Sequence, residues 1–365
     1  MLFLTSITMY NQEVFSVANI FGRNLSKSEI LKRVGDIEQL AQITSVELKE
    51  GNACGVRALD VRNGGGLHFL VIADRGLDIT VADINGIPLA IRFHPGEMRP
   101  DFHEDHPMAF IKNWAGGLMT TAGLTNVGGP GQEGIENLVQ HGNYNHIAAK
   151  NVQYEGLWEG DEYRLQIRGR VREVAPFYPN LELRRKITTY LGSNKIKIED
   201  EIENIGFKES PFMFLYHTNF GFPLVGENAE VIVKSKISGF KEGAPTDDVG
   251  DWNKISAPVH GISERVYYHD VQPDNDGYCK AGILNKNIGD GRKLELTMRY
   301  KKDQLPILSH WKMMAEGEYV IGLEPGNCHV EGRLKEREVF KTLQYLQPGE
   351  IKQAGLEFEV KLSKS

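Results

Sequence analysis

Two residues of this 365-residue chain, His217 and Glu324, could exchange protons with a substrate near neutral pH. An imidazole and a carboxylate have ordinary pKa values of about 6.5 and about 4.3, so a partly protonated ring and a charged carboxylate are both available there. His217 follows the apolar residues 211–214, and Glu324 follows the apolar residues 319–321. Both runs are strand-like, so each reactive residue is expected near the end of a strand. Because the two lie far apart in the sequence, only the fold could join them in one site.

The part of the chain after about residue 44 shows the pattern of many short strands joined by turns. Residues 56–61 and 67–72 flank the sequence Asn-Gly-Gly-Gly at 63–66, which is typical of a β-hairpin. Polar and apolar side chains alternate in further segments, as in half-buried strands: residues 163–168, 294–298 and 356–360. Because these strands do not alternate with helices, the pattern predicts an all-β fold, a large antiparallel β-sandwich.

The N-terminal residues 1–44 are expected to form an extension with one small helix. Ser26 and Glu29 match a capping box, in which each side chain accepts a hydrogen bond from the backbone amide of the other. Apolar side chains then recur at helical spacing: Ile30, Leu31, Val34, Ile37 and Leu40. This helix is expected to pack on the sheets without a catalytic role. Residues 45–365 contain no linker-like segment and are predicted to form a single domain.

The composition is that of an ordinary globular protein. Hydrophobic residues make up 41% and charged residues 25% of the chain, which are ordinary values for soluble proteins. The net charge of -7 argues against non-specific nucleic-acid binding, which needs a basic surface. A neutral small molecule is compatible with this charge.

Cysteine usage and hydropathy favour a cytoplasmic protein. Cys54, Cys279 and Cys328 are widely spaced and form neither a CxxC motif nor an obvious disulfide framework. No apolar stretch approaches the roughly 18 residues that would cross a membrane. The apolar residues 1–4 are too short for a signal peptide, and polar residues 11–13 follow them.

Five motifs, in this order, resemble the aldose 1-epimerase (galactose mutarotase-like) superfamily, and most closely a divergent bacterial branch of unknown function. They lie at residues 73–79, 116–124, 141–142, 217–221 and 322–328. The resemblance spans roughly residues 50 to 360 and implies the supersandwich of two extended sheets that this superfamily shares. It also implies interconversion of the α and β anomers of an aldose, with Glu324 as the base, His217 as the acid, and no metal or organic cofactor.

The resemblance implies sugar-binding roles for Arg75 and His141, and His141 is preferred over the nearby His146. Arg75 could instead pair with Asp74 or Asp78. Two residues are weaker candidates: Asn219 binds a hydroxyl or is an ordinary turn residue, and Trp311 stacks on the sugar or packs in the core.

The superfamily usually adds a sugar-binding Asp between the acid and base strands. Asp270, Asp274 and Asp276 are candidates, but none lies in a matching frame. The sequence therefore leaves this role open, together with the identity of the sugar and the oligomeric state.

Two rival functions remain open. A loop with His94, His103 and His106 offers ligand types that transition metals prefer, although the spacing fits no standard zinc frame, and we expect no bound metal. A metal at this loop would indicate a metal-dependent sugar isomerase or lyase. A sandwich that kept binding and lost turnover would be a sugar-binding protein, but the presence of both His217 and Glu324 favours an enzyme.

Overall fold

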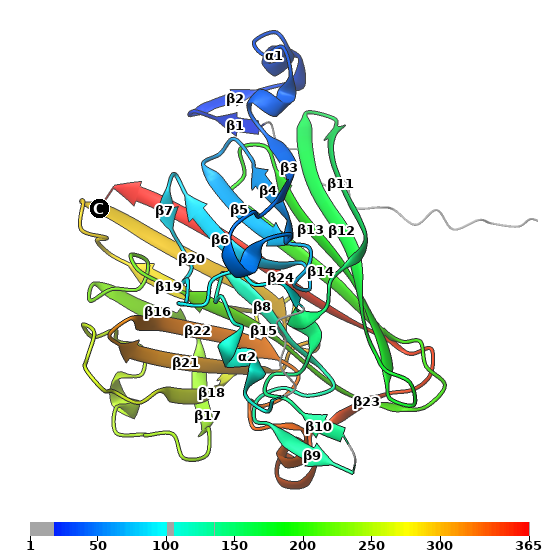
Figure 1. Ribbon diagram of the computed structural model, residues 1–365. Helices are drawn as coiled ribbons and strands as arrows, with labels where there is room; N and C mark the ends of the chain where they lie inside the picture. Colours follow the sequence, from blue (N-terminus) through cyan, green and yellow to red (C-terminus); the bar gives the residue numbers. More distant parts are fainter. Residues whose placement is uncertain (1–17, 101–105, 135, 365) are drawn as a thin grey trace, which may run out of the picture.

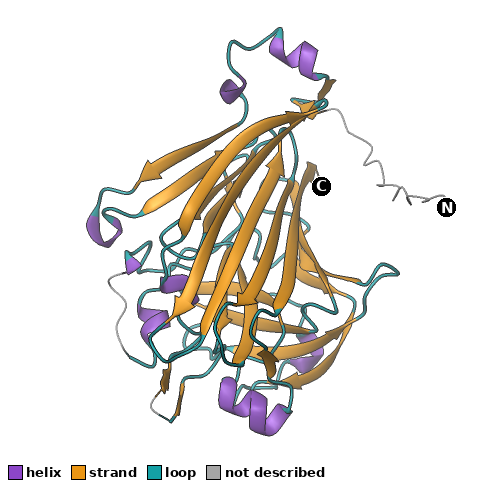
Figure 2. Ribbon diagram, turned by 90° about the vertical axis from the view of Figure 1, so that its right-hand side faces the viewer, coloured by secondary structure: helices purple, strands orange, loops and turns teal. Residues whose placement is uncertain are grey.

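The computed structural model describes residues 18–100, 106–134 and 136–364, which form two large antiparallel sheets packed face to face (Figure 1). The first sheet has eight strands, and Figure 2 shows its long strands lying side by side. In spatial order they are β11 (Lys150–Glu159), β12 (Glu162–Val174), β13 (Asn180–Tyr190), β14 (Lys195–Asn204), β24 (Ile351–Lys364), β20 (Arg292–Lys301), β19 (Tyr278–Asn285) and β16 (Ala229–Val233).

The second sheet has twelve strands and carries the motif residues. Its main path runs through β17 (Ser235–Phe240), β18 (Arg265–Val271), β21 (Ile307–Ala315), β22 (Glu318–Gly326), β15 (Ser210–Phe220), β8 (Met119–Leu124), β6 (Asp78–Ile84), β5 (Leu67–Ile72), β4 (Arg57–Arg62) and β3 (Gln42–Glu47). β23 (Gln344–Leu346) pairs with β15, and β7 (Ile87–Pro88) pairs with β6. The predicted all-β sandwich is therefore confirmed.

Short elements complete the described chain. Two small hairpins are formed by β1 (Ala18–Ile20) with β2 (Arg23–Leu25), and by β9 (Gly131–Glu133) with β10 (Glu136–Leu138). The helical segments are α1 (Lys27–Leu31), η1 (Ile37–Gln39), η2 (Gly51–Ala53), α2 (Ala109–Lys112), η4 (Tyr144–His146), η5 (Val249–Asp251), α3 (Arg333–Lys335) and η6 (Glu336–Phe340). No described helix has the length and apolar content needed to span a bilayer. The cytoplasmic location stays a prediction.

The N-terminal helix is shorter than the apolar pattern predicted. The capping box of Ser26 and Glu29 is present, but α1 ends at Leu31, whose side chain is exposed. Asp36 then caps a separate turn of 3-10 helix by accepting a hydrogen bond from the Glu38 amide. A capping residue inside the apolar repeat thus divides the predicted helix. The predicted division between residues 44 and 45 falls inside β3, and the division itself stays a prediction.

The hairpin predicted around residues 63–66 is confirmed as β4 and β5, with Arg62 opposite His68. Gly64 and Gly66 both have positive φ, which is a conformation that glycine adopts without strain.

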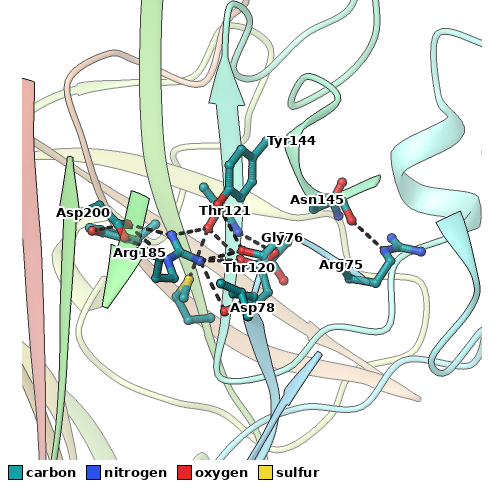
Figure 3. Close-up of polar contacts among 12 residues, drawn as sticks. Arg75, Gly76, Asp78, Thr120, Thr121, Tyr144, Asn145, Arg185 and Asp200 are labelled. Atoms are coloured by element: carbon teal, nitrogen blue, oxygen red, sulfur yellow. Dashed lines mark hydrogen bonds and ion pairs between the residues drawn. The ribbon is translucent and has the colours of Figure 1, made fainter. Parts of the chain in front are cut away.

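A charged cluster lies inside the sandwich, between the two sheets (Figure 3). The fully buried Arg185 of β13 donates to Asp78 of β6 at 2.9 Å and to Asp200 of β14 at 2.7 Å. It also donates to the Thr121 hydroxyl at 2.8 Å. The Tyr216 hydroxyl of β15 donates to Asp200 at 2.8 Å. These bonds tie strands of both sheets together through the core.

Candidate active site

His217 and Glu324 face each other on the outer surface of the twelve-stranded sheet. The register pairs Leu215 with Gly326 and Asn219 with Gly322, which sets His217 of β15 opposite Glu324 of β22. Nδ1 of His217 lies 3.3 Å from Oε1 of Glu324, and the two side chains are only 6% and 3% exposed. Strand alternation explains the shared face, because side chains in register on neighbouring strands point the same way.

Gly322 makes room for the carboxyl group of Glu324. A Cβ atom at position 322 would overlap Oε1 of Glu324 and would approach the Cβ of Trp311 to 3.2 Å. The carboxyl group therefore folds back over the strand towards the next row of side chains, where only glycine leaves space.

Aromatic rings enclose His217. Phe110 of α2, Trp114 just after α2, and Trp311 of β21 have ring centroids 6.4, 4.7 and 5.7 Å from its imidazole. His141 lies edge-on at 5.3 Å. These five side chains and Glu324 line a cleft of about 390 Å³, and most of its wall is apolar. α2 therefore covers part of the sheet at β15 and β22 (Figure 1).

The apolar surroundings shift the pKa values of the pair in opposite directions. Burial lowers the pKa of His217 to about 3, although the adjacent Asn219 amide opposes this shift. Burial raises the pKa of the Glu324 carboxyl well above its ordinary value, and the charge of Glu264 raises it further, while Lys241 lowers it. The imidazole is therefore neutral near pH 7, and the same apolar surroundings shift the carboxyl group towards its protonated form. Both shifts favour the uncharged form, whereas ordinary pKa values apply to fully hydrated groups.

Several buried polar atoms around the pair lack a hydrogen-bond partner among the described residues. They are Nδ1 of His217, Oε1 of Glu324, Oδ1 of Asn219, Oγ of Ser309 and Oε1 of Gln140. Ser309 stands opposite Glu324 on β21, so three of these atoms come from one row across three strands. Unpaired buried polar atoms are costly to stability, and those of His217, Glu324 and Gln140 at the cleft indicate a site for a polar ligand.

His141 and Trp311 lie at the cleft, as the site prediction requires. The Gly128 amide donates to Nδ1 of His141 at 3.4 Å, so the neutral ring carries its proton on Nε2 and can donate from there. Burial lowers the pKa of His141 well below its ordinary value, and the neighbouring His217 and Lys241 lower it further. The Trp311 indole donates to Oε2 of Glu264 at 2.8 Å, which fixes the plane of its ring.

Arg75 lies outside the cleft, contrary to the expectation that it reaches a sugar. Its buried guanidinium donates to three backbone carbonyls: Asn145 at 2.7 Å, Met98 at 3.3 Å and Asn113 at 3.0 Å (Figure 3 shows the Asn145 bond). Arg75 therefore joins three segments and supports the backbone just before Trp114. The alternative pairings are absent as well, because Asp74 binds Arg57 and Asp78 binds Arg185.

Asn219 also stays outside the cleft lining. It is fully buried, and its Nδ2 donates to the His217 carbonyl at 2.9 Å and to the Gly117 carbonyl at 3.1 Å. These bonds hold the strand that carries His217 against the segment before β8. The structure thus gives the amide nitrogen of Asn219 a supporting position, and the hydroxyl contact considered from the sequence stays a prediction.

The three candidate aspartates do not line the cleft. Asp270 pairs with Lys302 and Asp274 with Arg299, both in exposed positions. The carboxylate at the cleft, besides that of Glu324, is Glu264. Sequence reasoning missed Glu264 because no local pattern marks it.

Further cleft residues missed from the sequence are Phe110, Trp114, Gln140 and Lys241. Trp114 offered a signal, since it stands two residues before the Gly116–Gly117 motif.

The histidine loop gives no metal site in the part of the chain that the structure describes. His103 lies outside the described residues. His94 is exposed, and Nδ1 of His106 accepts a hydrogen bond from the Met108 amide at 3.0 Å. No group of three or more metal-binding side chains gathers among the described residues.

Comparisons with known proteins give a family and a fold. The family model described as "Domain of unknown function (DUF4432)" matches residues 53–360. A solved structure from Klebsiella pneumoniae subsp. pneumoniae MGH 78578, described as a "putative aldose 1-epimerase", is 22% identical with a TM-score of 0.79, covering 89% of this chain and 86% of that chain. A galactose mutarotase-like protein from Clostridium acetobutylicum is 15% identical with a TM-score of 0.61, covering 90% of this chain and 100% of that one.

A galactose 1-epimerase from Lactobacillus acidophilus NCFM is 12% identical with a TM-score of 0.55, covering 88% of this chain and 99% of that one. Identities this low show the fold alone, and that fold is the galactose mutarotase-like sandwich. The resemblance seen in the sequence is thus confirmed as a resemblance of fold, in a divergent branch. A search of curated proteins finds no match.

Proposed function

We propose that this chain, which belongs to the DUF4432 family, is a carbohydrate epimerase that interconverts the anomers of an aldose or related sugar without a cofactor. The observation that carries the proposal is the contact of 3.3 Å between His217 and Glu324 at the floor of an aromatic cleft. Ring opening needs one group that gives a proton and one that takes a proton at the same time, and these two side chains can do both. The mutarotase-like fold supports the same reading.

The reaction is balanced by two proton transfers. One residue of the pair removes the proton of the C1 hydroxyl, the C1–O5 bond breaks, and O5 takes a proton from the other residue. The O1 electrons form the carbonyl of the open-chain aldehyde. Rotation about the C1–C2 bond exposes the other face of the carbonyl, and the reverse transfers close the ring to the second anomer. The pair ends with the protons with which it began.

Burial favours Glu324 as the initial proton donor and His217 as the initial acceptor. In the neutral pair the mobile proton resides on the carboxyl group, while the imidazole offers an unprotonated nitrogen. This exchanges the roles that the family resemblance implied. Moving one proton from Glu324 to His217 recreates the other arrangement without changing the total proton count, so the two residues act as one coupled unit.

The surrounding residues suit a sugar ring. Trp311 and Trp114 present aromatic faces, with centroids 5.8 Å apart, to the apolar C–H face of a pyranose. His141 offers its Nε2 proton to a ring hydroxyl. The cleft volume of about 390 Å³ lies within the range of small-molecule sites.

The test is anomer exchange measured by NMR on a panel of D-glucose, D-galactose, D-mannose, D-xylose and D-ribose. Exchange between the two C1 proton signals should be faster with the protein than with buffer for at least one sugar. Treatment with a chelator should leave this rate unchanged. Binding without exchange would favour the sugar-binding protein, and exchange that is lost on chelation and restored by zinc or manganese would favour the metal-dependent enzyme.

A further inference from the structure

A charged pair that no sequence motif marks lies at the rim of the cleft. Lys241 follows β17, Glu264 precedes β18, and Nζ of Lys241 donates to Oε1 of Glu264 at 2.8 Å. The second carboxylate oxygen of Glu264 accepts the Trp311 indole proton at 2.8 Å. Both charged side chains keep contact with solvent, with exposed fractions of 33% and 43%. A ligand entering the cleft can therefore reach them.

The pair can bind more groups than it binds within the protein. An ammonium group has three N–H donors, and the bond described for Lys241 uses one of them, to Glu264. A carboxylate can accept about four hydrogen bonds, and the two described for Glu264 leave the others open. A donor and an acceptor held side by side match two adjacent hydroxyl groups, because each hydroxyl can accept one bond and donate another.

The charge balance at the rim favours a neutral ligand. Lys241 is the one cation among the described residues that line the cleft, and Glu264 already neutralises it. A carboxylate or phosphate on the ligand that bound Lys241 would lie close to the charged Glu264 and to a second carboxyl group, that of Glu324. Arg75, the other cation considered for binding, is held by three backbone carbonyls.

Trp311 links this rim to the reacting pair. Its ring lies 5.7 Å from the His217 ring, and its indole nitrogen is bound to Glu264. A sugar stacked on Trp311 therefore places one edge at His217 and Glu324 and another edge towards Lys241 and Glu264.

We propose that Lys241 and Glu264 together bind two adjacent hydroxyl groups of a neutral aldose, and that the cleft selects sugars carrying such a diol away from C1. This inference rests on the proposed function, since it assumes that the ligand is a sugar whose C1 end lies at His217 and Glu324. Lys241 and Glu264 would then determine which sugar binds, while His217 and Glu324 carry out the proton transfers.

The test uses Lys241→Met and Glu264→Gln with the sugar panel and with the 3-deoxy and 4-deoxy forms of D-glucose and D-galactose. Glutamine at 264 keeps an acceptor for the indole, and methionine keeps the length of the lysine stem. Each variant should raise KM for the complete sugar about 10–100-fold, the worth of a hydrogen bond to a charged group, with kcat changed less than about threefold. For the deoxy sugar that lacks the hydroxyl bound by the replaced side chain, variant and wild-type protein should have nearly equal KM. Removing the hydroxyl or the side chain breaks the same hydrogen bond, so removing both costs no more than removing one.

The matched control is the pair Lys195 and Glu357, at 2.9 Å on the outer face of the eight-stranded sheet. Lys195→Met and Glu357→Gln should leave KM and kcat at wild-type values. An unchanged KM in both cleft variants, or an equal increase for complete and deoxy sugars, overturns the proposal.

The outcomes separate this inference from the proposed function. If calorimetry detects a sugar whose binding both variants weaken, while no sugar exchanges, the diol site stands and the epimerase assignment fails. If exchange occurs but neither variant affects it selectively, the epimerase assignment stands and the diol site fails. If no sugar of the panel binds or exchanges, both are overturned.

Discussion

Tyr216 and His217 are neighbours on β15, yet one belongs to a hydrogen-bonded cluster in the core and the other to a cleft with unpaired polar atoms. The Tyr216 side chain points into the sandwich, where its hydroxyl donates to Asp200, which in turn binds Arg185 (Figure 3 shows Asp200 and Arg185). The His217 side chain points outward into the cleft, where its Nδ1 lies 3.3 Å from Oε1 of Glu324. One strand thus supplies both sites because successive side chains face opposite sides of a sheet.

The difference lies in how completely the buried groups are paired. Arg185 is balanced by two carboxylates and by hydroxyl and carbonyl oxygens, so its charge is retained in the core. Among the described residues no Lys or Arg forms an ion pair with Glu324, and burial favours its protonated form instead. A fully paired network fixes a structure, whereas an unpaired acid and base are ready to exchange protons with a ligand.

Loss of either member of the cleft pair should have the largest effect. Glu324→Gln and His217→Asn should each lower kcat for anomer exchange by about 10²–10⁴-fold, the usual contribution of a general acid or base. The double variant should be little worse than the worse single variant, because both residues act in one proton-transfer cycle. NMR exchange measures the rate, and calorimetry should show a much smaller change in sugar affinity. Exchange at the wild-type rate in Glu324→Gln would remove that residue from the mechanism.

Replacement of the core arginine should mainly affect the fold. Arg185→Met leaves Asp78 and Asp200 buried without their shared cation, which should lower the free energy of unfolding by about 3–5 kcal/mol. Urea denaturation measures the change. The more conservative Arg185→Lys provides a second reading if the methionine variant does not accumulate. A stability equal to the wild-type value in both variants would contradict the structural role of the cluster.

Acid should reveal the cost of keeping His217 neutral. Its pKa is lowered to about 3 in the folded protein, so between that pH and its ordinary pKa of about 6.5 the unfolded chain binds a proton that the folded chain does not. Stability therefore falls as the pH falls through this range, by about 1.4 kcal/mol per pH unit from this residue. Between pH 7 and pH 5 the wild-type protein should lose about 2 kcal/mol more than His217→Asn in urea denaturation. Equal losses would show that the ring is readily protonated in the folded state.

The smallest effect is expected at the neighbour of His217. Tyr216→Phe removes the hydroxyl that donates to Asp200 and should lower the free energy of unfolding by about 1 kcal/mol. The rate of anomer exchange should stay at the wild-type value, because this side chain faces away from the cleft. A loss of exchange comparable to that of His217→Asn would show that the two faces of β15 are coupled.

Local patterns in the sequence determined the class of fold and the types of reactive residue. Alternation of apolar and polar side chains predicted the antiparallel sandwich, and the turn glycines predicted the hairpin of β4 and β5. The apolar residues before His217 and Glu324 predicted that each belongs to a strand, as β15 and β22 confirm. These features depend on residues that are neighbours along the chain, so they can be predicted without knowledge of the fold.

Tertiary structure decided the distances, the charge states and the remaining partners. The register of β15 with β22 placed His217 beside Glu324, and burial then shifted both groups towards their uncharged forms. Arg75 donates to backbone carbonyls up to 70 positions away in the sequence. Glu264 lines the cleft although no sequence motif marks it. Hydration, electrostatic shifts and hydrogen-bond competition depend on groups that are close in space, and a sequence specifies those neighbours only through the folded chain.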